Sequence, residues 1–434
     1  MTEASFEKVV RERQFAGVLQ THSEAFFRLA NTLRANETRW SKRHYFQLVS
    51  ESETLESFLD DYGARYNRTY NPLTELVASL RGFSKAGYSL AHLLGRLESY
   101  GISEWLSDQE VSAFAHSMER SREFIRESIE CLLQAIAEEA SGLGLEPTPH
   151  SLEDPKSLPV VARRRLPRNT DHDDLADEAQ KIAEVASRFI QAAQMLGDLN
   201  IRSIDDVGQR RQFLAGICTE EQARVYEATV HNLQSAYDTF IKNTVIEASD
   251  ERLPRLRGHA SAALHLLEAV TYLTHFYERH ESDSRSDVLC SRLERLASRD
   301  QVQEVSLNHL LLWATRVLEK GRAVAEDLLP AYTNVQELEV ELDDDIELHA
   351  RPAALIVGIV NRYGTPVEME VGGRSCNAGS ILELLVTVGS HPNARHFVFR
   401  GDENPLRDIR MLFEHGLGEG GIENLPAELG YLRT

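Results

Sequence analysis

The chain has 434 residues and an excess of acidic side chains, 68 Asp+Glu against 47 Lys+Arg, which gives a formal net charge of −21. This charge argues against a nucleic-acid coat, because phosphate backbones attract surfaces rich in lysine and arginine. At about 150 residues per domain, the length predicts roughly two to four domains.

The start of the chain, MTEASFEKVVRERQ, lacks the basic stretch and apolar core of a secretory signal. No apolar run approaches the roughly 18 residues that a membrane-spanning helix needs. The cysteines are far apart and form no C-x-x-C pair, which fits a reducing compartment. We therefore expect a cytoplasmic protein with neither nucleic acid nor membrane as a partner.

Two long segments, residues 1–142 and 173–333, are predicted to be all-α helical bundles. Helix starts are marked by Asn71-Pro72, by a capping box at Ser107–Glu110, and by a second one at Thr219. Residues 143–172 between them are rich in proline and predict a linker. The basic cluster Arg163–Arg168 in this linker is either a solvated stretch or an arm that docks a partner.

The hydrophobic period changes in the last segment, residues 334–434. ELEVEL at 337–342 and PVEMEV at 366–371 alternate apolar and polar residues, as half-buried strands do. With the helices and further strands between and after them, the order is β-α-β-β-α-β-α, which predicts an antiparallel α+β sandwich with one open face. The later GLGEGG follows a helix rather than a strand, so we expect a flexible Gly-rich tail instead of a dinucleotide site.

A histidine stands directly before the first helix of this segment. His349 is followed by Arg351 and Pro352. A helix N-terminus has unpaired N–H groups and a partial positive charge, which favour a phosphate and a neutral, nucleophilic imidazole. Arg351 adds a fork of donors for phosphate oxygens. The alternative is an ordinary capping or surface histidine.

Three blocks of residues in this segment match one family in order. They are Leu348-His349-Ala350-Arg351-Pro352-Ala353-Ala354, then Asn377-Ala378-Gly379-Ser380-Ile381-Leu382, then Gly401-Asp402-Glu403. Residues 335–415 therefore resemble HPr, the histidine-containing phosphocarrier of the sugar phosphotransferase system. Glu347 stands where family members usually have Gly, and Glu383 where many have Lys.

The resemblance implies a role for several residues. His349 would accept the phosphoryl group and Arg351 would pair with it, while Ser380 would be a regulatory serine for a dedicated kinase. Ser380 can equally be a plain helix cap. Ile381, Leu382 and Leu385 would form an apolar patch that docks partners, which would be enzyme I-like and enzyme IIA-like proteins.

We accordingly expect a bacterial phosphocarrier or a phosphorylation-controlled regulator, rather than an enzyme with turnover. The helical part would bind an effector or a second copy of the chain. The alternative is a scaffold that is not phosphorylated and keeps the HPr-like fold for docking. No cofactor motif occurs. His275 and Glu278 are one helical turn apart with His280 off that face, so solvated or capping roles are more usual there than a metal site.

Overall fold

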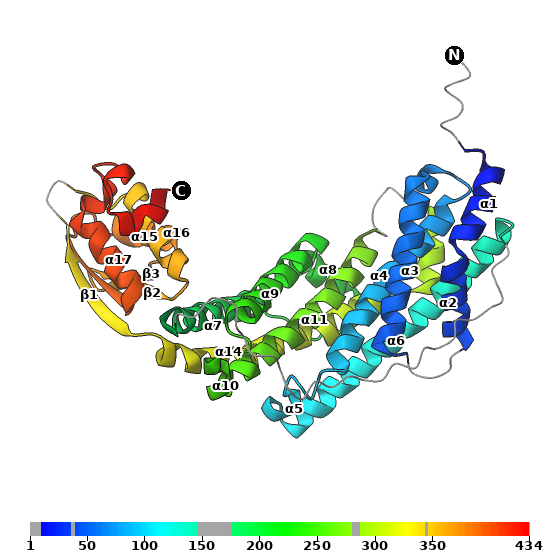
Figure 1. The fold of residues 1–434 in the computed structure, drawn as a ribbon, viewed down its shortest axis with the longest axis horizontal. Helices are drawn as coiled ribbons and strands as arrows, with labels where there is room; N and C mark the ends of the chain where they lie inside the picture. The colour runs from blue at the N-terminus through cyan, green and yellow to red at the C-terminus, as the bar shows by residue number, and fades with distance from the viewer. Residues whose placement is uncertain (1–9, 36–39, 146–174, 280–286, 343–345, 434) are drawn as a thin grey trace, which may run out of the picture. The chain divides into compact units, whose positions relative to one another are not determined.

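The computed structural model describes residues 10–35, 40–145, 175–279, 287–342 and 346–433. Within these ranges, every regular element before Val335 is a helix, and a four-stranded sheet with further helices follows (Figure 1). The predicted fold class, helical bundles followed by an α+β segment, is confirmed.

The first helical segment contains α1 (Glu12–His22), α2 (Glu24–Ala35), α3 (Lys42–Asp61), η2 (Ala64–Tyr66), α4 (Asn71–Leu94), α5 (Ile102–Trp105) and α6 (Asp108–Gly142). The second contains α7 (Leu175–Gly197), α8 (Val207–Ile217), α9 (Glu220–Phe240), α10 (Val245–Ser249), α11 (Arg252–Arg279), α12 (Asp287–Leu296), α13 (Arg299–Glu304), η3 (Val305–Leu311) and α14 (Leu312–Tyr332).

Both predicted capping boxes are present. The Ser107 hydroxyl accepts from the Glu110 amide at 3.3 Å, and the Glu110 carboxylate accepts from the Ser107 amide at 2.9 Å. Thr219 and Gln222 make the same reciprocal pair before α9, at 3.3 and 2.9 Å. These bonds satisfy N–H groups that have no partner inside the helix, which is why both helices begin where the sequence predicts.

The chain forms two compact units that are interleaved along the sequence. One contains residues 1–166, 196–231 and 258–318, and the other contains 167–195, 232–257 and 319–434. The predicted linker at 143–172 lies outside the described residues apart from its first three. The predicted boundaries 1–142, 173–333 and 334–434 stay predictions.

The second unit carries the antiparallel sheet, made of β1 (Val335–Glu341), β2 (Val367–Val371), β3 (Arg374–Asn377) and β4 (His396–Asp402) in the order β1-β4-β2-β3. Phe399 of β4 pairs with Leu338 on one side and Met369 on the other, and all three are buried. They mark the centre of the core under the helices. This alternation is the one that the sequence predicts for ELEVEL and PVEMEV.

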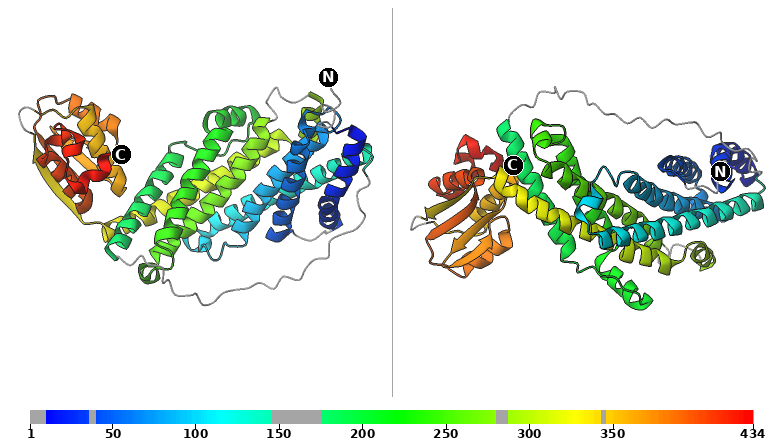
Figure 2. Two further views of the ribbon diagram at one scale, coloured as in Figure 1. Left: turned by 45° about the horizontal axis from the view of Figure 1, so that its top comes forward. Right: turned by 90° about the horizontal axis from the view of Figure 1, so that it is seen from below.

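Three helices, α15 (Ala350–Tyr363), α16 (Ile381–Gly389) and α17 (Glu403–Glu414), cover one face of the sheet. Figure 2 draws this segment from two further sides, at the red end of the colour scale. The other face is charged, with Arg400 bound to Glu337 at 2.6 Å and to Glu370 at 3.3 Å across neighbouring strands. The segment is therefore the open-faced sandwich that the sequence predicts.

The far end of α15 contacts α7 inside the same unit. The Gln180 amide of α7 donates to the Tyr363 carbonyl at 3.3 Å, and Asn404 donates to the Gln180 carbonyl oxygen at 2.8 Å. Gly364 ends α15 with a φ of +69°, and a Cβ there would lie 2.7 Å from Glu184. Only glycine allows this close approach together with the left-handed backbone.

The Gly-rich tail packs on the helices, so the expectation of a flexible tail is wrong. It forms η4 (Gly416–Gly418), η5 (Ile422–Asn424) and η6 (Ala427–Arg433). Leu417, Leu425 and Leu429 are buried in the same core as α15 and α17. Leu425 and Leu429 are four residues apart, but glycines and polar residues surround all three leucines, and so short an apolar pattern does not predict the packing.

Candidate functional site

His349 caps the N-terminus of α15. Its backbone is extended, and its carbonyl accepts the first helical bond from the Ala353 amide at 3.0 Å. The ring atom Nδ1 accepts from the Arg351 amide at 3.4 Å, a long and therefore weak hydrogen bond. The side chain is 51% exposed. One ring nitrogen thus faces the helix N-terminus, and the ring is open to a partner.

The second ring nitrogen contacts the tail. Nε2 of His349 lies 3.1 Å from Oε1 of Glu419, and the Glu419 side chain is 36% exposed. An N–H that donates to Nδ1 requires a lone pair there, so the hydrogen of the neutral ring is on Nε2. The two contacts therefore fit the same tautomer, in which Nε2–H donates to Glu419.

Arg351 extends the site on the solvent side. It is exposed, and within the described part of the chain its guanidinium makes no ion pair. Pro352, the next residue, is buried. Its fixed φ stiffens the first turn of α15, where no intrahelical hydrogen bond is lost. A phosphoryl group on Nδ1 would lie at the N-terminus of α15, and the Arg351 guanidinium follows two residues later in the chain.

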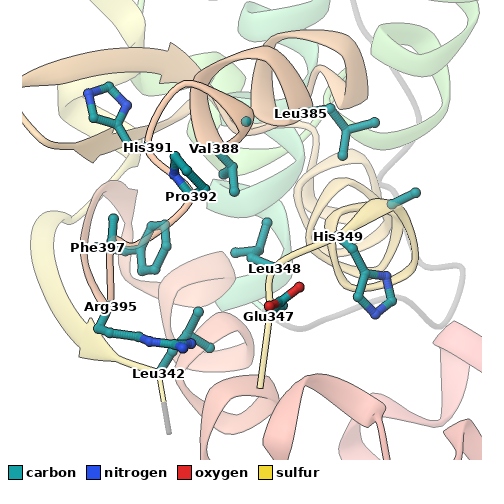
Figure 3. A pocket seen from close by; sticks show the side chains of 13 residues that line it. Leu342, Glu347, Leu348, His349, Leu385, Val388, His391, Pro392, Arg395 and Phe397 are labelled. Atoms are coloured by element: carbon teal, nitrogen blue, oxygen red, sulfur yellow. The ribbon is translucent and has the colours of Figure 1, made fainter. Parts of the chain in front are cut away.

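A cavity of about 320 Å³ lies beside His349 (Figure 3). Its apolar wall includes Leu348, Leu385, Val388 and Phe397. Arg395 lines it as well and donates to the Ile346 carbonyl, which fastens the loop before the histidine. The cavity continues the histidine site toward α16.

Ser380 is the N-cap of α16. Its hydroxyl accepts from the Glu383 amide at 3.4 Å, and the Glu383 carboxylate accepts from the Asn377 amide at 3.1 Å. The Glu383 carboxylate thus already sits at this helix N-terminus. A phosphate on Ser380 would meet that negative charge as well as the helix N–H groups.

The family comparison agrees with this geometry. The model described as the PTS HPr component phosphorylation site matches residues 336–392, which include β1 from its second residue, α15, β2, β3 and α16. The C-terminal segment is an HPr-like domain. Both His349 and Ser380 lie inside the matched range of this domain, whereas Glu419 and the tail lie outside it. No solved structure matches the chain.

The predicted docking residues of the HPr-like domain lie on α16. Ile381 and Leu382 are 43% and 71% exposed, whereas Leu385 is partly buried and lines the cavity beside His349. Sequence reasoning missed Val386, which is 55% exposed. Its position four residues after Leu382 is the helical spacing that could have revealed it. We refer to Ile381, Leu382 and Val386 as the α16 patch.

Outside the HPr-like domain, the described residues give no catalytic or metal-binding role to the other candidates from the sequence. The basic cluster 163–168 lies outside the described residues. His275 and Glu278 both contact Glu220 at the start of α9, at 2.8 Å each, so they hold a helix end. Across the described ranges, no group of three or more His, Cys, Asp or Glu side chains could hold a metal ion, and none of the helices could cross a bilayer.

A polar cluster in the first unit escaped the sequence analysis. The rings of His92 and His265 lie 4.3 Å apart, and His265 Nδ1 lies 2.9 Å from Glu268. The Lys42 ammonium contacts Nδ1 of His92. Burial, and then the charge of His265, lower the pKa of His92 to about 4. Because these residues come from three different helices, no local motif indicates them.

Proposed function

We propose that the chain is a phosphorylation-controlled regulator or phosphocarrier whose HPr-like domain accepts a phosphoryl group on His349. The observation that carries the proposal is the ring orientation, with Nδ1 facing the first N–H groups of α15 in an exposed side chain. A helix N-terminus favours an arriving anion, and the Nδ1 lone pair is the nucleophile that would attack it.

Arg351 supports the transfer from a different direction. Its guanidinium carries a permanent charge and can pair two phosphate oxygens at once. It takes no part in an ion pair with the described residues, so no bond within them has to be broken first. We therefore assign it to phosphate pairing, as the resemblance implies.

An HPr-like domain implies partners in the phosphotransferase system. We propose an enzyme I-like donor and an enzyme IIA-like acceptor or a serine kinase, in the cytoplasm of a bacterium. The α16 patch is exposed, and Leu385 and Val388 of the same helix line the cavity beside His349, so apolar surface for docking such a partner lies near the site. The helical region would pass the phosphorylation state to an effector.

The test uses the purified full chain with phosphoenolpyruvate and enzyme I, read by intact mass and by acid lability. The native chain should gain one acid-labile phosphoryl group, and His349→Ala should gain none. His396→Ala is the matched control, because His396 is a comparably exposed histidine of the same domain, paired with Glu339 on β1. Retained labelling in His349→Ala would contradict the proposal.

The alternative scaffold function rests on the carboxylates around the site. Glu347 lies two residues before His349, and Glu383 occupies the N-terminus of α16. Both charges oppose an arriving phosphate or an acidic partner. Absence of any mass gain in both the native chain and Glu347→Gly, with the cognate enzyme I, would favour the scaffold. A faster gain in Glu347→Gly would instead support transfer opposed by a local charge.

A further inference from the structure

We propose that Glu419, in the tail beyond the family match, is a positioning residue that holds the His349 ring by accepting a hydrogen bond from Nε2–H and so directs the phosphoryl group to Nδ1. This proposal rests on the proposed function. The carboxylate oxygen and Nε2 are 3.1 Å apart, within hydrogen-bond range. The Arg351 amide holds the opposite ring nitrogen.

The three residues before Glu419 have left-handed backbone conformations, and this turn sets the position of the Glu419 side chain. Gly416, Leu417 and Gly418 all have positive φ, at +60°, +53° and +72°. A leucine in this left-handed conformation costs free energy, which is tolerated only where the surroundings fix it. Leu417 is fully buried in the domain core, and this burial holds the strained turn.

The turn is wedged between the two segments that build the histidine site. A Cβ at Gly416 would lie 3.3 Å from Ile346, in the loop before His349, and a Cβ at Gly418 would lie 3.1 Å from Leu355 of α15. The next residue is Glu419, whose amide donates to the Gly416 carbonyl at 3.0 Å. The glycines thus allow the tail to approach closely enough to present Glu419 to the ring.

The rest of the tail is anchored on the other side of Glu419. The Tyr431 hydroxyl donates to the buried Asp408 carboxylate of α17 at 2.7 Å, and the Tyr363 hydroxyl of α15 donates to the same oxygen at 2.7 Å. Burial, and then Asp408, raise the pKa of Tyr363 to about 12. The Tyr363 phenol therefore stays protonated at neutral pH. Tyr431 donates to the same oxygen and fastens the part of the tail that follows Glu419.

The chemistry of transfer explains what Glu419 would contribute. The Nδ1 lone pair, released from its long hydrogen bond to the Arg351 amide, attacks the phosphorus of a phosphohistidine donor. The new N–P bond forms while the donor N–P bond breaks, and the electron pair of the broken bond returns to the donor ring. The imidazole of His349 then carries a positive charge and still has the hydrogen on Nε2. Glu419 accepts that N–H throughout, so no proton has to move, and its charge faces the edge of the ring opposite the phosphoryl group.

The test compares Glu419→Ala and Glu419→Gln with Glu428→Ala, a matched change of an exposed carboxylate elsewhere in the tail. The rate of phosphorylation by enzyme I and phosphoenolpyruvate is measured in the full chain. Because the pair is partly exposed, we expect Glu419→Ala to be roughly 2- to 5-fold slower and Glu428→Ala to be unchanged. Glutamine still accepts a hydrogen bond from Nε2–H but lacks the charge, so the rate of Glu419→Gln should lie between those of Glu419→Ala and the native chain.

A second readout separates positioning from a structural effect. With ¹⁵N-labelled histidine, and with His349→Ala to assign the signal, the His349 ring of the native chain should show one tautomer with hydrogen on Nε2. Glu419→Ala should show mixed tautomers and a broadened Nε2–H signal, while Glu428→Ala keeps the native spectrum.

The outcomes distinguish this proposal from the proposed function. A native chain that is phosphorylated, together with a Glu419→Ala variant of equal or higher rate and unchanged ring signals, would overturn the role of Glu419 alone. No phosphorylation of the native chain by its cognate enzyme I would overturn the proposed function itself, and the transfer role of Glu419 with it.

Discussion

The left-handed turn before Glu419 makes a quantitative prediction for Gly418→Ala. An L-residue with this φ, +72° in the structure, costs about 1–2 kcal/mol in the left-handed region. The added Cβ would also press on Leu355 at 3.1 Å. Alanine also lowers the conformational entropy of the undocked tail, which offsets about 0.4–1 kcal/mol of this cost. We therefore expect tail docking to weaken by about 1 kcal/mol, a roughly fivefold larger undocked fraction.

Hydrogen exchange of the tail amides measures this fraction directly. The Glu419 and Gly421 amides donate within the turn, at 3.0 and 3.1 Å, and both should exchange about fivefold faster in Gly418→Ala. Gly420→Ala is the matched control, since φ is not left-handed there and no atom lies within 4 Å of its Cβ. Equal exchange in the two variants, or native exchange in Gly418→Ala, would refute the argument from backbone strain.

Four further predictions concern single side chains. Tyr431→Phe removes a hydrogen bond to the buried Asp408, so the tail should exchange faster by an amount equivalent to about 1–2 kcal/mol, while the ring remains near the Arg362 guanidinium. Arg351→Ala should slow phosphorylation roughly three- to tenfold without abolishing it, because the helix N-terminus still contributes; complete loss of labelling would contradict this. Ser380→Ala should weaken α16 by about 1 kcal/mol in exchange experiments, and Ser380→Asp should keep the cap but lower the affinity for enzyme I; unchanged affinity in both variants would leave Ser380 as a cap alone. His92 has a pKa of about 4 in the folded chain, below its unfolded value, so the unfolded state binds more protons and the first unit should lose stability as pH falls from about 6.5 to 4; after allowance for solvent screening we expect about 1–2 kcal/mol, and His92→Gln should flatten this part of the pH profile of unfolding.

The sequence predicts those parts of the HPr-like domain in which local pattern and burial agree. Alternation in β1 identifies Leu338 and Val340, and the extent of α15 follows from the residue before its first turn and from Gly364 after its last. Each of these signals lies within a few residues of the feature that it marks, which is why both elements could be found without the structure.

Glu419 could not be found in this way. It is far from His349 in sequence, and its position depends on a buried leucine in a backbone conformation that leucine rarely adopts. The glycines of GLGEGG do suggest positive φ, but they do not say which segment they approach. The interleaved division into two units is equally inaccessible, because it depends on pairings between residues far apart in the chain.

The contact between α7 and the end of α15 bears on how far the HPr-like domain is autonomous. Gln180 satisfies the Tyr363 carbonyl and holds Asn404, although it precedes the domain by about 150 residues. A fragment that begins at residue 334 would lose both bonds and expose the Gly364 turn to water. Transfer rates measured on such an excised fragment would therefore describe a helix with a frayed end, whereas the intact chain presents His349 on a helix that is supported from outside its own domain.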